Sequence, residues 1–314
     1  MRWPALSVVL AVLVGGCASP LGRPQPGQAP ARISVIASFY PLYEFTKRIG
    51  GDGVDVRNLV PPGVSPHDFE PSAQDMATLH RARVLVYNGA GFEPWVEKVL
   101  PTLPETVERV DTTAGLLLLA GRHDDQPHGA GRREQREAAR ADPHVWLDPL
   151  LAQRQAGRIL DALARVDPGR REVYRANAAS LEADLAALHE RIAVRLGRCR
   201  QRTIVTAHAA FSYFARRYGL RMIAISGLSP EAEPSPIRLR QVLHQVRQYR
   251  VRAIYFETLA SPKVAQTIAR EVGARTLVLD PVEGLTLDRQ AVGATYFTVM
   301  NENLQQLVEG LDCP

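Results

Sequence analysis

The sequence is poor in lysine, in cysteine and in long apolar runs, and each scarcity narrows the kind of protein that it can encode. Its 314 residues include only three lysines, Lys47, Lys98 and Lys263, so arginine carries almost all of the positive charge. The formal net charge is +5, but the arginines are spread along expected helices, which argues against nucleic-acid binding. The apolar run Leu6–Val14 is shorter than the roughly 20 residues that cross a bilayer, so we do not interpret it as a membrane span.

The first 16 residues are typical of an export signal. Arg2 supplies positive charge before the apolar run, and two glycines precede Cys17. A cysteine in this setting resembles the lipidated residue of a bacterial lipoprotein, although an ordinary signal peptide with a coincidental cysteine has the same pattern. Residues 17–31 are rich in proline, glycine, serine and glutamine, and we expect them to form a flexible tether. We therefore predict an exported protein that a lipid on Cys17 holds on the extracytoplasmic side of a membrane, in the periplasm or at the cell surface.

Only two cysteines follow Cys17, namely Cys199 and Cys313. Exported proteins can keep disulfides that would be reduced in the cytosol. The spacing of the two residues does not decide whether they pair. A disulfide between Cys199 and Cys313 is therefore a hypothesis that the sequence leaves open.

Both halves of the chain alternate expected strands with expected helices. In the first half we expect strands at 32–38, 54–60, 83–89 and 107–110, and Leu116–Leu119 is expected to be a further strand or a buried segment. In the second half we expect strands at 202–207, 222–225, 251–256 and 275–279. This alternation is the pattern of α/β proteins with parallel, doubly wound sheets.

A long helical segment separates the two halves. Residues 170–196 would form a helix of roughly 40 Å at 1.5 Å per residue, after a break near Asp167–Gly169. Its apolar residues form a single stripe at Leu181, Leu185, Leu188 and Ile192. We therefore predict an N-terminal lobe over 32–168, a linking helix over 169–198 and a C-terminal lobe over 199–314.

Two histidines follow prolines in loops that the sequence makes stiff. His144 follows Pro143, and the apolar residues directly after it would anchor the loop in a core. His67 follows Pro66 in a loop that comes after an expected strand. Because proline fixes φ and removes a donor, each histidine has little backbone freedom. Either histidine could also be a surface residue of a tight loop.

His208 and Asp280 each come directly after an expected strand of the second half. Ligands of open α/β sheets bind beyond the carboxyl ends of the strands. If two lobes face each other across a cleft, these two residues can meet His67 and His144 there. Three imidazoles and one carboxylate suit a closed tetrahedral zinc site, and the carboxylate also accepts manganese or iron. The alternatives are that His208 is a hydrogen-bonded core residue and that Asp280 only forms a turn before Pro281.

A metal-bound histidine needs an acceptor at its second ring nitrogen. Asp68 and Asp148 are candidates for this role, and Glu257, which also ends an expected strand, is a third candidate or an alternative ligand. The segment 121–141 breaks all periodicity and contains His123 and His128. It is either a solvated charged loop or a weak accessory metal-binding loop.

Four motifs occur in order along the chain and together resemble one protein family. They are Pro-His-Asp-Phe-Glu-Pro-Ser at 66–72, Asp-Pro-His-Val-Trp-Leu-Asp-Pro at 142–149, Thr-Ala-His-Ala-Ala-Phe-Ser-Tyr-Phe at 206–214 and Leu-Asp-Pro at 279–281. With the lipoprotein-like signal, they resemble the metal-specific solute-binding proteins of zinc and manganese ABC importers, the ZnuA and TroA type. The resemblance covers nearly all of the chain after the signal.

This resemblance implies two α/β lobes joined by one long helix, with a metal ion between the lobes. It implies that His67, His144, His208 and Asp280 are the ligands. In the family the third ligand is a histidine in zinc binders and a glutamate in manganese binders, so His208 favours Zn²⁺, with Mn²⁺ as the alternative. It also implies that a membrane permease of an ABC importer is the partner, and we expect a monomer. The loop at 121–141 matches the position of a histidine-rich loop of the zinc lineage but is rich in arginine instead.

Two other function classes compete with metal capture. Four protein ligands leave no open coordination position, so we expect a binding protein and not an enzyme. A mononuclear zinc hydrolase would use three ligands and a water, with Glu257 or Glu70 as general base, but the sequence has no HExxH motif. A surface adhesin is compatible with a lipid anchor, although no apolar motif argues for it.

Overall fold

The structure is a computed structural model that describes residues 31–121 and 140–314. The expected signal at 1–16, the lipidated Cys17 and nearly all of the tether at 17–31 lie outside the described residues, as do His123 and His128. Among the described helices, none is both long enough and apolar enough to cross a membrane.

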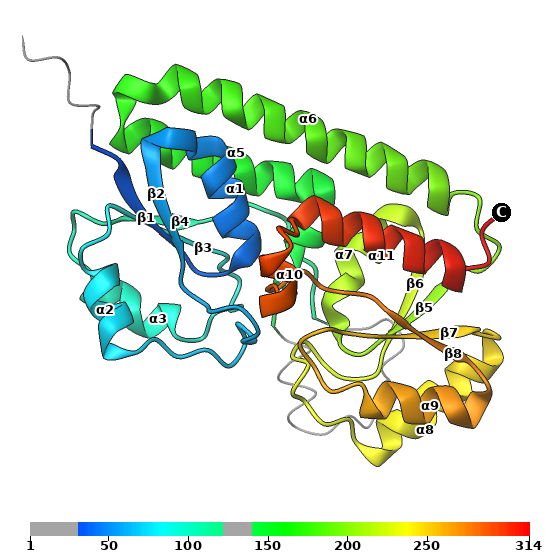
Figure 1. Cartoon of the computed structure of the whole chain (residues 1–314). Helices are drawn as coiled ribbons and strands as arrows, with labels where there is room; N and C mark the ends of the chain where they lie inside the picture. Colours follow the sequence, from blue (N-terminus) through cyan, green and yellow to red (C-terminus); the bar gives the residue numbers. More distant parts are fainter. Residues whose placement is uncertain (1–30, 122–139) are drawn as a thin grey trace, which may run out of the picture. The chain divides into compact units, whose positions relative to one another are not determined.

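Two four-stranded parallel sheets form the framework of the described chain (Figure 1). The first sheet has the order β2-β1-β3-β4, and its strands are β1 Ile33–Ala37, β2 Val54–Asn58, β3 Val84–Tyr87 and β4 Glu108–Asp111. The second has the order β6-β5-β7-β8, and its strands are β5 Thr203–Thr206, β6 Arg221–Ala224, β7 Ala253–Phe256 and β8 Arg275–Val278. Every pairing is parallel, so the predicted fold class of two α/β lobes is confirmed.

Helices cover both faces of each sheet. The helices of the first half are α1 Tyr40–Gly50, α2 Ala73–Leu79, α3 Val96–Val99 and α5 Pro149–Val166. Those of the second half are α7 Ser212–Tyr218, α8 Pro236–Gln248, α9 Lys263–Val272, α10 Leu287–Ala291 and α11 Tyr296–Gly310. Strand residues alternate between two apolar clusters: Val35 packs on the side of α1 and α5, and Ile36 on the side of α2 and α3. The inner strands β3 and β7 are buried on both faces, which explains why their residues are almost wholly apolar.

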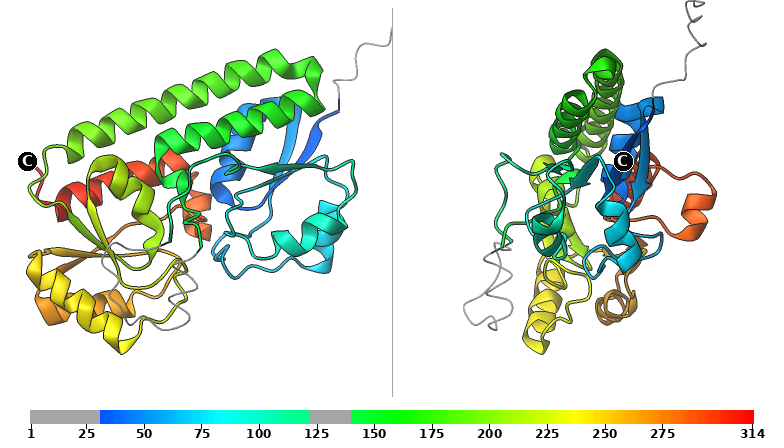
Figure 2. Two further views of the ribbon diagram at one scale, coloured as in Figure 1. Left: turned by 180° about the vertical axis from the view of Figure 1, so that it is seen from behind. Right: turned by 90° about the vertical axis from the view of Figure 1, so that its left-hand side faces the viewer.

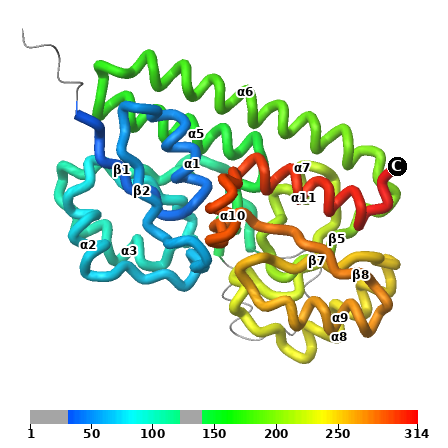
Figure 3. The backbone as a smooth tube through the Cα atoms, in the orientation of Figure 1, coloured from blue at the N-terminus to red at the C-terminus, as the bar shows by residue number. Residues whose placement is uncertain are grey.

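The helix α6 Arg171–Leu196 lies along one side of the two halves and extends over both (Figures 2 and 3). Its 26 residues span roughly 39 Å. It packs against α1 and α5 of the first half and against α7 and α11 of the second. The predicted stripe is fully buried, namely Leu181, Leu185, Leu188 and Ile192. The predicted break is a single 3-10 turn at Pro168–Arg170. The lobe bounds at 168 and 199 stay a prediction, but one sheet lies on each side of α6 in the sequence.

Ser72 and Asp75 form a capping box at the start of α2, because Ser72 Oγ accepts the Asp75 amide and Asp75 Oδ2 accepts the Ser72 amide. The prediction for Leu116–Leu119 is wrong, because the segment forms no strand and Leu117 is 88% exposed. The only regular pairing nearby in the described chain is a single bridge between Ala120 and Ala141, so consecutive leucines alone did not indicate burial.

Cys199 and Cys313 form a disulfide, the pairing that the sequence left open. The bond joins the segment after α6 to the segment after α11. It therefore encloses the whole second sheet between its two ends.

A buried polar network ties the loop before α5 to the carboxyl ends of β1 and β3. The Glu93 carboxylate accepts hydrogen bonds from the Ser38 hydroxyl at 2.6 Å and from the Asn88 amide at 2.7 Å. The Asn88 side chain donates to the Pro143 carbonyl at 2.9 Å and accepts from Gln155 at 2.9 Å. Burial raises the pKa of Glu93 from its ordinary 4.5 to about 7, despite these donors.

The raised pKa of Glu93 predicts that the metal-free protein loses stability as the pH rises. The folded state holds the Glu93 proton more tightly than the unfolded state, so its contribution is present below pH 4.5 and is lost as the pH rises through about 7. Between pH 5 and 8 the free energy of unfolding should fall by about 2.5 kcal/mol more in the wild type than in Glu93→Gln. Urea unfolding at several pH values measures this difference. Glu105→Gln, at an exposed position, should retain the wild-type slope, and equal slopes for wild type and Glu93→Gln would contradict the prediction.

Candidate metal centre

Three histidines and one glutamate bring four metal-binding groups to one point. The side chains belong to His67, His144, His208 and Glu283, and one ligand atom of each lies within 4.8 Å of all the others. His67 and His144 come from the first half of the chain, where one follows β2 and the other precedes α5. His208 and Glu283 come from the second half, where they follow β5 and β8. The site therefore needs both halves.

The spacing of these atoms matches a tetrahedral ion. Glu283 Oε1 lies 3.2 Å from His67 Nε2, 3.4 Å from His144 Nε2 and 3.3 Å from His208 Nε2. The Nε2 atoms of His144 and His208 are 3.4 Å apart. Ligands about 2.0–2.1 Å from a zinc ion at tetrahedral angles are about 3.3–3.4 Å from one another. Four of the six ligand–ligand distances thus have the length that such an ion requires.

Buried carboxylates hold the second ring nitrogens of two histidines. Asp142 Oδ1 lies 2.9 Å from His144 Nδ1 and also accepts the His144 amide. Glu257 Oε1 lies 2.6 Å from His208 Nδ1 and also accepts the His208 amide. Each carboxylate contacts both the ring nitrogen and the backbone amide of its histidine. These two contacts orient the ring so that its Nε2 atom faces the common centre.

The three carboxylates expected to support the histidines have different surroundings. Glu257 contacts the second ring nitrogen of His208. Asp148 instead caps α5 by accepting the Leu150 amide and pairs with Arg217 at 2.8 Å. Asp68 is largely exposed, and the partial desolvation of its carboxyl together with the neighbouring Glu231 raises its pKa. The support that we expected from Asp148 comes from Asp142, which precedes His144 by two residues.

The structure does not bring Asp280 into the cluster, and Glu283 has the place that the sequence analysis gave to Asp280. Asp280 Oδ1 accepts the Val282 amide at 2.7 Å, and Oδ2 accepts the Thr258 hydroxyl at 2.5 Å. Asp280 therefore shapes the turn that presents Glu283. Glu283 was not among the residues expected to bind the metal ion, because no local pattern of the segment Leu279–Leu285 distinguishes it from Asp280 as a ligand.

The charges at the centre favour an ionised carboxylate and a protonated histidine before a metal ion binds. Burial would raise the pKa of Glu283, but the three imidazoles around it hold that pKa well below its usual range. Burial would lower the pKa of His208, but Glu257 and Glu283 raise it to about 10. A metal ion binds the neutral imidazole, so it must displace a proton from this cluster.

Aromatic side chains exclude water from the side of the first half. Phe92 packs edge-on against His67, with ring centres 4.8 Å apart. The ring centres of Trp146 and His144 are 5.3 Å apart. His144 and His208 are fully buried, whereas the His67 side chain remains 9% exposed. His67 is therefore the ligand nearest to solvent.

Comparison with known proteins agrees with this geometry. The model of the family described as "Zinc-uptake complex component A periplasmic", ZnuA, matches residues 35–310. The chain belongs to the ZnuA family. The high-affinity zinc uptake system protein ZnuA of Bacillus subtilis is 35% identical over 313 residues, which cover 99% of this chain and 98% of that protein.

Two streptococcal proteins extend the comparison. The zinc-binding lipoprotein AdcA of Streptococcus pneumoniae is 39% identical over 91% of this chain, but over only 57% of AdcA, so the chain spans little more than half of that relative. The Zn(II)-bound ZnuA-like domain of AdcA has a TM-score of 0.75 at 38% identity and covers 90% of this chain and 100% of that domain. The laminin-binding protein Lmb of Streptococcus agalactiae, described as bifunctional with adhesin and metal transporting activity, has a TM-score of 0.78 at 33% identity and covers 90% of this chain and 100% of Lmb.

The support of His208 by Glu257 gives a first test of the centre. Glu257→Gln leaves the ring nitrogen with a neutral partner, so zinc affinity should fall about 10- to 100-fold. Competition titration with a zinc chelator measures the change. Glu309→Gln is the matched control, because Glu309 pairs with Arg275 at the surface, and it should leave the affinity unchanged. Wild-type affinity in Glu257→Gln would contradict the role of Glu257.

Proposed function

We propose that this protein captures Zn²⁺ outside the cytoplasm and delivers it to the membrane permease of an ABC importer. The observation that carries the proposal is the convergence of three imidazoles and one carboxylate at the ligand spacing of a tetrahedral ion. Membership of the zinc-uptake family supports the same function. Zinc is the cargo of this protein and not a resident cofactor.

We propose His67, His144, His208 and Glu283 as the ligands, with Glu283 in place of Asp280. Four protein ligands leave no open position for a reacting water, which suits capture and does not suit catalysis. The bases that a hydrolase would need are engaged elsewhere. Glu257 holds His208, and Glu70 lies at the surface and pairs with Lys98 at 3.0 Å.

The donor set favours Zn²⁺ over Mn²⁺. Three imidazole nitrogens suit zinc, whereas manganese prefers carboxylates, carbonyls and water in octahedral sites. The matched relatives from Bacillus subtilis and Streptococcus pneumoniae are named for zinc uptake and zinc binding. Mn²⁺ remains the alternative cargo, and competition between the two ions in one titration separates them.

We further propose that the protein is a monomer anchored by a lipid on Cys17, with residues 17–31 as the tether. The pattern of the first 17 residues supports this location, and the AdcA relative is named a lipoprotein. A tether of this kind would keep the captured ion close to the permease. The likeness to Lmb motivates a second candidate function, attachment to laminin, which a solid-phase binding assay with purified laminin would test.

The choice between Glu283 and Asp280 as the fourth ligand can be decided by substitution. Glu283→Gln removes the charged ligand and should lower zinc affinity about 100-fold or more. Asp280→Asn keeps an oxygen for the Val282 amide and should lower the affinity less than about tenfold. His208→Ala should lower it strongly without unfolding the protein. Competition titration with circular dichroism as the folding control measures all three. If Asp280→Asn weakens zinc binding more than Glu283→Gln does, the ligand set is wrong.

Delivery to a permease can be tested by growth under zinc limitation. A strain of the source organism that lacks the gene should grow poorly in the presence of a zinc chelator, and added zinc should restore growth. The wild-type gene should also restore growth, whereas the Glu283→Gln gene should do so only at higher zinc concentrations. The Glu309→Gln gene should behave as the wild type. Normal growth of the deletion strain with chelator would contradict a role in uptake, provided that no second importer is expressed.

A further inference from the structure

Trp146 contacts both halves of the metal centre. It follows His144 by two residues, is fully buried, and donates its indole N–H to the Pro281 carbonyl at 2.7 Å. Pro281 precedes Glu283 by two residues. One side chain thus joins the loop of a ligand from the first half to the turn of a ligand from the second half.

The ring of Trp146 packs against three other rings. Its centre lies 5.3 Å from that of His144, 4.8 Å from that of Phe92 and 4.7 Å from that of Phe39. Its backbone carbonyl accepts the Tyr296 hydroxyl at 2.6 Å. The indole therefore has one well-defined position from which to hold Pro281.

The turn that Trp146 holds is strained. Val282 has φ of 58°, a left-handed conformation that a β-branched residue rarely adopts. Such a conformation persists only when the surroundings fix it. The described contacts fix it from two sides: Asp280 accepts the Val282 amide, and Trp146 holds the preceding carbonyl.

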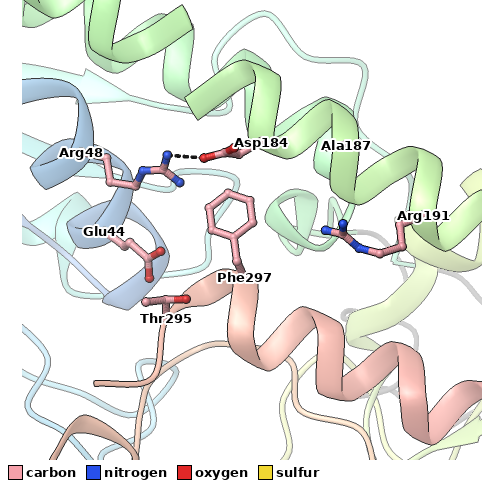
Figure 4. Close-up of a pocket in the computed structure, with 7 residues that line it drawn as sticks. All are labelled: Glu44, Arg48, Asp184, Ala187, Arg191, Thr295 and Phe297. Carbon is pink, nitrogen blue, oxygen red and sulfur yellow. Dashed lines mark hydrogen bonds and ion pairs between the residues drawn. The ribbon is translucent and has the colours of Figure 1, made fainter. Parts of the chain in front are cut away.

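Tyr296, which holds the backbone of Trp146, is itself fixed at the contact between α1 and α11. The Tyr296 amide donates to Glu44 Oε2 at 2.6 Å, and the Tyr40 hydroxyl donates to the same oxygen at 2.5 Å. Figure 4 shows Glu44 with Thr295 and Phe297 on the wall of a cavity of about 500 Å³ between α1, α6 and α11. Through Tyr296 and Trp146, three hydrogen bonds thus link this wall to the turn that carries Glu283.

We propose that Trp146 is a positioning residue that sets the place of Glu283 relative to His144. The proposal rests on the function proposed above, zinc capture by the three histidines and Glu283. Without the indole N–H, the Pro281 carbonyl loses its partner and the strained turn can relax, so Glu283 moves away from the point where the three Nε2 atoms meet. The indole N–H of Trp146 then contributes to zinc affinity only through Glu283.

A double-mutant cycle on zinc affinity tests this role. Trp146→Phe keeps an aromatic ring and removes the N–H, and it should lower the affinity about tenfold, mainly through faster zinc dissociation. In the Glu283→Gln background the same substitution should change the affinity less than about twofold, because the group that it positions is already gone. Tyr296→Phe removes only a hydroxyl, and it should give a smaller loss with the same dependence on Glu283.

Trp95 provides the matched control. It is also fully buried, and it packs near Phe69 in the apolar cluster on the α2 and α3 side of the first sheet. Its indole nitrogen has no hydrogen-bond partner within the described residues. Trp95→Phe should change the melting temperature of the metal-free protein but not zinc affinity.

The outcomes separate this inference from the proposed function. If the wild type does not bind zinc tightly, the proposed function is wrong. If Glu283→Gln weakens binding but Trp146→Phe does not, only the inference about Trp146 is overturned. Equal losses from Trp146→Phe in both backgrounds also overturn it, because they would show a general effect on the fold. If Trp146→Phe does not fold, the cycle with Tyr296→Phe decides by the same criteria.

Discussion

One carboxylate oxygen surrounded by three imidazole nitrogens is the constraint on which the rest of the structure depends. Glu283 Oε1 lies 3.2–3.4 Å from the Nε2 atoms of His67, His144 and His208, although the four residues are spread over more than 200 positions of the chain. Charged and polar groups this close together are costly to bury without hydrogen-bond partners, so the metal-binding side chains need partners outside the cluster. Asp142 and Glu257 supply it at two histidines, and the Asp280–Val282 turn supplies it at Glu283.

The fold satisfies this constraint by ending strands of two sheets at the same place. His67, His208 and Glu283 all lie past the carboxyl ends of parallel strands, where open α/β sheets bind their ligands. The helix α6 keeps the two sheets together, because its buried stripe belongs to an apolar cluster that includes residues of both halves. Since packed interiors resist deformation, the distance between the two pairs of ligands is set by this shared core as well as by the loops.

The sequence predicts the parts of the site that depend on strand order and proline, and it fails where the backbone adopts an unusual conformation. His67 and His144 are recognisable because Pro66 and Pro143 fix their loops, and His208 because it follows a strand. Glu283 is not, since it reaches the centre only through the left-handed Val282, which no local pattern indicates. Asp142 and Asp148 flank the same motif equally well, and only distances assign the first to His144 and the second to Arg217. The prediction for Leu116–Leu119 was wrong for a simpler reason. An apolar run without periodicity does not indicate whether another part of the chain packs against it.

The disulfide between Cys199 and Cys313 makes residues 199–313 a covalent ring. Closing a ring of this length removes about 4–5 kcal/mol of entropy from the unfolded chain in the loop-closure model. The ring contains His208 and Glu283, whereas His67 and His144 lie on the open part of the chain. Two of the four ligands therefore stay within one covalent ring even in the unfolded chain, whereas the other two are joined only by the open chain before it.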